Sequence, residues 1–167
     1  RAWWRLSGNT VMIAGTDLAD RTIDADDIFT FLDGKLAQRF IYHPADVAAR
    51  IAAFDFAPDL DGRYRVNECY CHDTTWQDAL RALVGLSDVV LMDLRGFKAH
   101  NEGCRFELAT LAQTPRALRL VVLTDVQTDR EAARQAVGGG REERFVWVDA
   151  SSVDARKRRE VLARLFG

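Results

Sequence analysis

The chain has 167 residues, of which 48% are hydrophobic and 29% are charged, a balance typical of a globular protein with a substantial hydrophobic core. The formal net charge is −2, which gives no bulk electrostatic reason to expect nucleic acid as a partner. No apolar run approaches the roughly 20 residues needed to span a bilayer, and no signal peptide is visible.

Short apolar runs alternate with amphipathic stretches along the whole chain. The apolar runs predict buried strands, and the stretches with apolar side chains at helical spacing predict helices. In chain order we predict a strand at 10–14, a helix at 24–40, a short strand at 40–42, a helix opened by Pro44, a strand at 63–71, a helix at 76–86, a strand at 89–92, a loop at 95–102, a helix at 103–113, a strand at 120–123, a helix at 129–137, a strand at 145–148 and a helix at 154–166.

Continuously apolar strands separated by helices imply a mainly parallel sheet with helices on both faces. Right-handed crossovers then restrict the topology to a doubly wound α/β fold. Because the chain is short, we expect a flavodoxin-like, five-stranded sheet of order 2-1-3-4-5 rather than a six-stranded Rossmann sheet.

Residues 1–9 are predicted to form a tail, and residues 10–167 a single domain. The segment Arg1-Ala2-Trp3-Trp4-Arg5 combines aromatic and basic side chains, as juxtamembrane segments often do. We therefore expect either a membrane tether upstream of residue 1 or a tail that docks its tryptophans on the core. The protein would be cytoplasmic, either alone or as the soluble part of a membrane protein.

The three cysteines, Cys69, Cys71 and Cys104, form no disulfide framework and favour a reducing compartment. Cys69, Cys71 and His72 form a C-x-C-H run. A closed zinc site usually needs four ligands, and the sequence offers no second ligand pair. On a strand the first two cysteines would share one face, where buried free cysteine is common. We therefore predict no metal site.

Ligands of open α/β sheets bind beyond the carboxyl ends of the strands. The residues that follow each predicted strand are therefore candidate binding residues, although acidic residues there are also ordinary helix caps. These candidates are Gly15, Thr16, Asp17, His72, Asp73, Asp93, Arg95, Gly96, Thr124, Asp125 and Asp149.

Glu107 lies early in a predicted helix that begins at this edge of the sheet. Its neighbours Cys104, Phe106, Leu108 and Leu111 are apolar and look core-directed. The carboxylate would then face the cleft with partial shielding, where it could act as a base or stabilise positive charge on a ribose. The alternative is a first-turn glutamate that the helix dipole favours.

Three short motifs resemble the second half of a TIR domain, and the resemblance extends in pieces from Val11 to Leu111. The motifs are Trp76-Gln77-Asp78-Ala79-Leu80, the apolar strand after Leu86-Ser87-Asp88, and Gly103-Cys104-Arg105-Phe106-Glu107-Leu108. The resemblance implies that Glu107 matches the catalytic helix glutamate of TIR domains that cleave NAD. More distantly, the chain resembles nucleoside 2-deoxyribosyltransferases, which use a helix glutamate as nucleophile.

Both resemblances imply a nucleotide or NAD-like substrate and no separate cofactor. Glu107 would act on the ribose, Arg95 would pair with phosphate, and Trp76 or Phe97 would stack on a base. The expected substrate-binding residues are Gly15, Thr16, Asp17, His72, Trp76, Asp93, Arg95, Gly96 and Asn101.

Two other functions stay open at this point. Departures from the TIR motifs, such as Gly103 in place of tryptophan, favour a non-enzymatic signalling or assembly module that binds a nucleotide or associates with itself. A receiver-like domain would use Asp93 as its phosphoacceptor, but a strand-end lysine partner is not obvious. The Gly138-Gly139-Gly140 run lies at the opposite edge of the sheet and predicts a helix C-cap.

Overall fold

The computed structural model describes residues 4–14, 40–115, 119–139, 141–152 and 154–167. The predicted helix at 24–40, up to residue 39, and the candidates Gly15, Thr16 and Asp17 lie outside these residues. The chain divides into two compact units, Arg1–Leu83 and Val84–Gly167, and each is described by itself.

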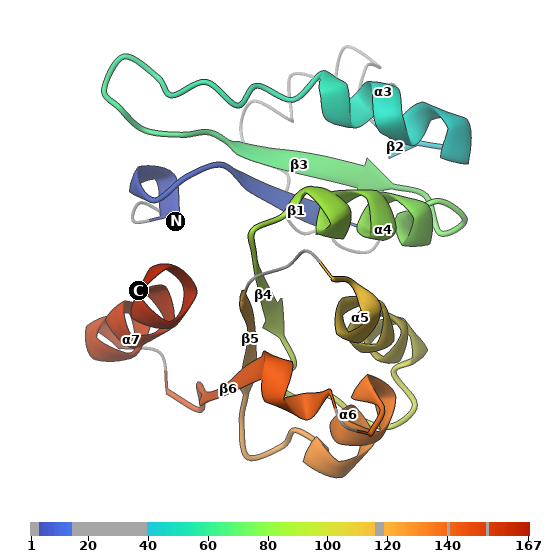
Figure 1. Cartoon of the computed structure of the whole chain (residues 1–167), viewed down its shortest axis with the longest axis vertical. Helices are drawn as coiled ribbons and strands as arrows, with labels where there is room; N and C mark the ends of the chain where they lie inside the picture. Colours follow the sequence, from blue (N-terminus) through green and yellow to red (C-terminus); the bar gives the residue numbers. More distant parts are fainter. Residues whose placement is uncertain (1–3, 15–39, 116–118, 140, 153) are drawn as a thin grey trace, which may run out of the picture. The chain divides into compact units, whose positions relative to one another are not determined.

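The first unit is built on a three-stranded parallel sheet whose strand order is β1-β3-β2 (Figure 1). The strands are β1 (Thr10–Ala14), β2 (Phe40–Ile41) and β3 (Val66–Cys71), and the helices are η1 (Trp4–Leu6), η3 (Pro44–Asp46), α3 (Val47–Ala52) and α4 (Trp76–Leu86), whose last three residues belong to the second unit.

Helices α3 and α4 of the first unit pack on one face of its sheet. Val47 and Ile51 of α3 and Ala79 and Leu83 of α4 join Cys69 and Cys71 of β3, with Ile41 of β2, in one buried cluster. The α4 residues recur at the i, i+4 spacing that places them on one side of a helix. Helix α4 therefore buries the side that carries Ala79 and Leu83 against the sheet.

The described part of the predicted tail is anchored to a loop of the first unit. The Arg5 guanidinium donates hydrogen bonds to the Tyr64 carbonyl oxygen (2.9 Å) and to the Asp59 carboxylate (3.0 Å). The Tyr64 N–H in turn donates to the Arg5 carbonyl oxygen (2.7 Å). The expected docking of the tryptophans falls on side chains outside the described part of the chain.

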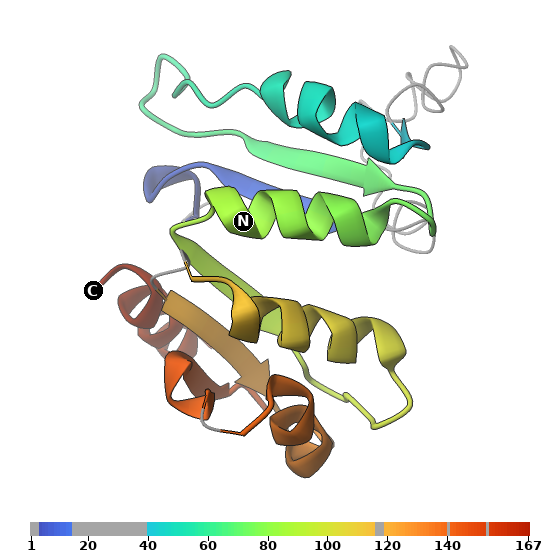
Figure 2. The ribbon, with the colours of Figure 1, turned by 45° about the vertical axis from the view of Figure 1, so that its right-hand side comes forward.

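The second unit contains a three-stranded parallel sheet of order β4-β5-β6. Its strands are β4 (Val89–Asp93), β5 (Arg119–Thr124) and β6 (Phe145–Asp149), and its helices are α5 (Glu102–Gln113), α6 (Arg130–Val137), η4 (Glu142–Arg144) and α7 (Ala155–Phe166). Helices α5 and α6 lie side by side on one face of this sheet and α7 lies on the other (Figures 1 and 2). The central strand β5 is buried on both faces, which explains its continuous apolar run.

The α/β class and the parallel pairing are confirmed, but the expectation of one five-stranded sheet is not met. The described residues form six strands in two three-stranded sheets, and the short strand predicted at 40–42 is β2, which pairs with β3. Helices on both faces are found in the second unit, whereas α3 and α4 of the first unit lie on one face of its sheet. Among the helices of the described ranges, none combines the length and apolar composition that a membrane span requires.

Candidate functional site

The loop that follows β4 is tied to the loop that follows β5. Both loops lie at the carboxyl edge of the second sheet, where ligands of parallel sheets bind. The links are hydrogen bonds from Gly96 N–H to Asp125 Oδ1 (3.0 Å), from Lys98 Nζ to the Gln127 carbonyl (2.7 Å), from Asp129 N–H to the Phe97 carbonyl (2.9 Å), and between Thr128 Oγ1 and the Leu94 carbonyl (2.9 Å).

Asp125 is the centre of this loop–loop link. Its Oδ1 accepts hydrogen bonds from the N–H groups of Gly96 and Gln127, each at 3.0 Å, and lies 2.9 Å from the Thr128 hydroxyl. The Gly96 hydrogen bond is the main reason that the pKa of Asp125 is lowered, because each such bond favours the charged carboxylate. Asp125 therefore braces the loops and uses its acceptor capacity within the fold.

Gly96 is required by the turn that carries Arg95 out of β4. The Phe97 N–H donates to the Leu94 carbonyl (3.0 Å), and Gly96 has a φ of 72°, the conformation that the third residue of a type II turn adopts. Phe97 is only 3% exposed, so the expectation that it stacks on a base is wrong. Its ring is part of the core because the turn directs it inward.

Arg95 and Asp93 form a close ion pair at the same edge. The Arg95 guanidinium donates to both carboxylate oxygens, at 2.6 Å and 2.9 Å for the shortest contacts, and the two side chains are 39% and 47% exposed. Burial alone would raise the pKa of Asp93, but the hydrogen bonds and charge of Arg95 outweigh it and lower that pKa. The pair engages Nε and Nη2 of Arg95, so a phosphate that binds these nitrogens would compete with Asp93.

Asn101 closes the far end of the β4–α5 loop. Its side-chain oxygen accepts a hydrogen bond from the Lys98 N–H (2.7 Å), and it makes no capping hydrogen bond to the first turn of α5. Because the Lys98 ammonium is bound to Gln127, it does not serve as the lysine partner that a receiver-like Asp93 would need.

Glu107 lies in the second turn of α5 and is partly buried. The helix begins at Glu102, so the interpretation of Glu107 as a first-turn glutamate is wrong and Glu102 takes that place. Burial raises the pKa of Glu107, and no hydrogen bond or opposite charge from the described residues offsets that effect. Glu107 in turn raises the pKa of Cys104, one helical turn earlier, although burial of the thiol is the larger cause.

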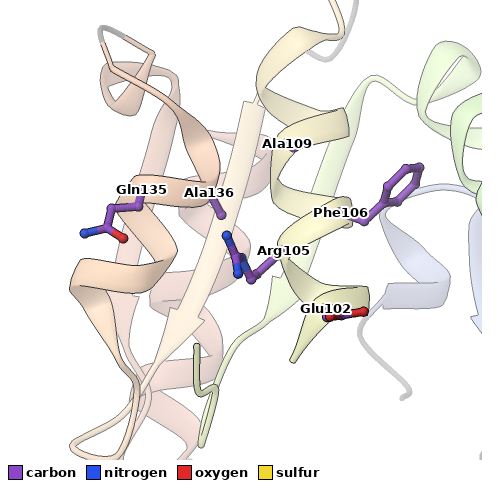
Figure 3. A pocket seen from close by; sticks show the side chains of 6 residues that line it. All are labelled: Glu102, Arg105, Phe106, Ala109, Gln135 and Ala136. Carbon is purple, nitrogen blue, oxygen red and sulfur yellow. The ribbon is translucent and has the colours of Figure 1, made fainter. Parts of the chain in front are cut away.

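A hollow of about 420 Å³ lies between α5 and α6, and Glu107 is not among the residues that line it (Figure 3). The lining residues are Glu102, Arg105, Phe106, Ala109, Gln135 and Ala136. At about 100° per residue, Glu107 lies on the side of α5 away from Arg105 and Ala109. This hollow is therefore not the cleft expected for the Glu107 carboxylate.

His72 and Trp76 belong to the first unit and are held by the turn that opens α4. The His72 carbonyl accepts hydrogen bonds from the N–H groups of Thr75 (2.9 Å) and Trp76 (3.2 Å), and its ring lies 5.8 Å from that of Tyr42. Trp76 is partly buried against the cluster around Cys69. The local geometry explains both residues by packing and turn formation.

The structure thus joins Asp93 to Arg95 and Gly96 to Asp125, whereas Asn101 and Glu107 occupy other parts of the β4–α5 segment. Sequence reasoning missed Thr128 and Lys98, which complete the link between the loops. Asp125 and Thr128 are three residues apart after a strand, and this spacing is a turn pattern that could have identified Thr128.

The chain matches no protein-family model, no curated protein and no solved structure.

Proposed function

We propose that the chain is a TIR-like domain that binds a nucleotide and hydrolyses the N-glycosidic bond of NAD, with Glu107 as its catalytic carboxylate. The observation that carries the proposal is the partly buried Glu107, whose pKa is raised by burial without compensation from the described residues. Ionisable groups with such perturbed pKa values concentrate at functional sites.

The chemistry of glycosidic cleavage suits a carboxylate in this state. Positive charge develops on the ribose as the bond to nicotinamide breaks, and a carboxylate shielded from water stabilises that charge more strongly than an exposed one. Because no described side chain bonds to Glu107, its oxygens keep their acceptor capacity for a ligand or a water.

A flavodoxin-like strand order is part of the same proposal. The expected order 2-1-3-4-5 counts only the five longer strands, which are β1, β3, β4, β5 and β6. The neighbours β3 and β1 in the first sheet, and the succession β4, β5 and β6 in the second, support that proposed order. Arg95 would contribute a phosphate contact on a loop that is already fixed to its neighbour, which reduces the entropy lost on binding.

The test is NAD consumption by the purified chain, comparing wild type with Glu107→Gln. We expect the substitution to lower turnover by roughly 10²- to 10⁴-fold, the range for one catalytic carboxylate. Glu102→Gln is the matched control, because Glu102 is an exposed glutamate on the same helix, and it should retain turnover. Equal turnover in wild type and Glu107→Gln, or no turnover in wild type, contradicts the enzymatic proposal.

A non-enzymatic nucleotide-binding or self-associating module is the second candidate. The side chains of Asp125, Asn101 and Arg95 already form hydrogen bonds with other residues at the carboxyl edge. A substrate would have to displace these internal partners, which favours the module over an enzyme. Equilibrium dialysis with NAD, followed by chromatography of the recovered nucleotide, separates the candidates. Intact NAD in the bound fraction, together with concentration-dependent oligomers in sedimentation, supports the module.

A further inference from the structure

Cys69 and Cys71 form a buried dithiol in the first unit. They lie two residues apart on β3 and point to the same face, which α3 and α4 cover. Both side chains are fully buried, and their sulfur atoms are 3.8 Å apart. The pair is therefore held close together in an apolar environment shielded from water.

A positive charge from α3 acts on this dithiol. Arg50 lowers the pKa of Cys69 through its charge, after the larger lowering effect of the hydrogen bond with Cys71 and against the raising effect of burial. The Nε of Arg50 is buried and has no hydrogen-bond partner among the described residues. A buried unsatisfied donor is unfavourable, and a negative charge placed beside it would relieve that penalty.

The two thiols differ in how readily they lose a proton. The hydrogen bond that favours the Cys69 thiolate raises the pKa of Cys71, which burial and repulsion from the Cys69 thiolate raise further. The two thiols therefore lose their protons unequally, and the second proton is held more tightly than the first. A cation that replaces this proton would remove the repulsion between two thiolates.

We propose that Cys69 and Cys71 bind one Cu(I) ion as a two-coordinate bis-thiolate whose charge Arg50 balances. Binding releases both thiol protons and involves no change of oxidation state. One monovalent cation and two thiolates leave a net charge of −1, which the guanidinium neutralises. Thiolates are the soft ligands that select Cu(I).

The geometry disfavours the two alternatives for such a cysteine pair, a structural zinc site and a disulfide. A structural zinc site almost always has four ligands, and within the described ranges no group of three or more His, Cys, Asp or Glu residues could hold a metal ion. A disulfide would require the sulfurs to close from 3.8 Å to about 2.05 Å. Residues i and i+2 of an extended strand are about 6.6 Å apart, near the upper limit for a disulfide.

A two-coordinate ion requires a smaller rearrangement. Two metal–sulfur bonds of about 2.3 Å, the length found for zinc thiolates, place the sulfurs about 4.6 Å apart when linear. The pair therefore needs to open by less than about 1 Å from its 3.8 Å separation, and a bent arrangement would need less.

The test uses the reduced full chain and Cu(I) supplied as a complex with a competing chelator. We expect one ion per chain by native mass spectrometry, with two sulfur ligands in X-ray absorption at the copper edge. Cys69→Ser and Cys71→Ser should each lose this binding, whereas the matched Cys104→Ser should keep it. Arg50→Gln should weaken Cu(I) by roughly 10- to 100-fold, the usual effect of a group that supports metal ligands, and Arg63→Gln should not.

Several results would overturn the proposal. Equal binding by Cys69→Ser and Cys104→Ser, or nitrogen and oxygen ligands in the absorption spectrum, would place copper elsewhere. Wild type that takes no Cu(I), even when refolded in its presence so that burial cannot block entry, would exclude the site. The absorption measurement on wild type still decides the question if the serine variants fail to fold.

Discussion

The Gly96 N–H after β4 donates a 3.0 Å hydrogen bond to the carboxylate of Asp125 after β5. Together with the contacts of Lys98 and Thr128, this bond makes one connected structure of two loops at the carboxyl edge of the second sheet. Loops at this edge commonly bind ligands, and a loop that is already ordered loses less entropy when it does so. The link therefore supports the position of Arg95 rather than supplying ligand contacts itself.

Asp125→Asn should lower the melting temperature at neutral pH, because the amide loses the charge that strengthens the hydrogen bonds from the Gly96 and Gln127 N–H groups. The pKa of Asp125 is lowered in the folded protein, so its contribution is complete above the ordinary aspartate value of about 3.9 and is lost as pH falls through the lowered pKa. Thermal unfolding near neutral pH and well below about pH 3.9 checks this. The difference from wild type should shrink in acid, and Glu143→Gln, an exposed control, should show little difference at either pH.

Thr128→Val tests the hydroxyl that completes the link. This oxygen accepts from the Asp125 N–H at 2.9 Å and lies 2.9 Å from the Leu94 carbonyl, in a side chain that is 9% exposed. Valine keeps the shape but leaves the Asp125 donor without its partner, which destabilises a protein by about 1–3 kcal/mol. Urea denaturation measures this loss, and an unchanged midpoint would show that water replaces the hydroxyl.

The strand and helix pattern of the second unit followed from the sequence because it is local. The run Val89-Val90-Leu91-Met92 predicts β4, and the strand in the structure is longer by one residue, Asp93.

In the first unit, β3 is shorter than the strand predicted at 63–71, because it begins at Val66. Before that point Arg65 pairs with Asp55 and Asp59, both at 2.9 Å, in a charged loop that strand periodicity does not detect.

The candidate site was less predictable because its contacts are not local. The sequence predicts that Glu107 lies on a helix, and because α5 begins at Glu102 the residue lies in its second turn and not in the first turn that the helix-dipole interpretation requires. The partners Gly96 and Asp125 are 29 residues apart in sequence, a separation at which hydrophobic periodicity carries no information. The inward direction of Phe97 likewise depends on the turn at Gly96 and not on its own residue type.

Gly96→Ala should destabilise the second unit through the backbone. At a φ of 72°, a residue with a Cβ is disfavoured by about 1–2 kcal/mol. The added carbon would have no heavy atom within 4 Å, so the loss comes from the backbone conformation and not from a steric clash. Gly85→Ala on α4 is the matched control, because it also meets no neighbour within 4 Å and has no positive φ. Chemical denaturation should show a loss for the first substitution and a small gain or no change for the second.

Arg144→Met should loosen the end of α5. The Arg144 guanidinium donates to the carbonyl oxygens of Ala112 (2.7 Å) and Thr114 (2.5 Å), groups at a helix C-terminus that lack helical partners. Methionine keeps the aliphatic stem but leaves these carbonyls unpaired, which destabilises by about 1–3 kcal/mol. Hydrogen exchange should accelerate in the last turn of α5, and Arg141→Met, at an exposed neighbour, should leave it unchanged.

Glu107→Gln should stabilise the protein at neutral pH, the opposite of what a structural glutamate predicts. Burial raises the pKa of Glu107, so the folded state holds its proton more tightly than the unfolded state does. The penalty for the charged form is complete above the raised pKa and disappears as pH falls to the ordinary glutamate value of about 4.3. The variant should therefore melt higher by on the order of 2 °C near neutral pH and should match wild type in acid.

The control for this last prediction is Glu102→Gln, which removes an exposed carboxylate from the first turn of the same helix. The helix dipole favours negative charge there, so this substitution should lower the melting temperature slightly at neutral pH. A lower melting temperature for Glu107→Gln as well would mean that its carboxylate makes a stabilising contact in the fold. Groups kept at a cost to stability are those that function requires, so stabilisation with loss of NAD turnover would link the buried carboxylate to catalysis.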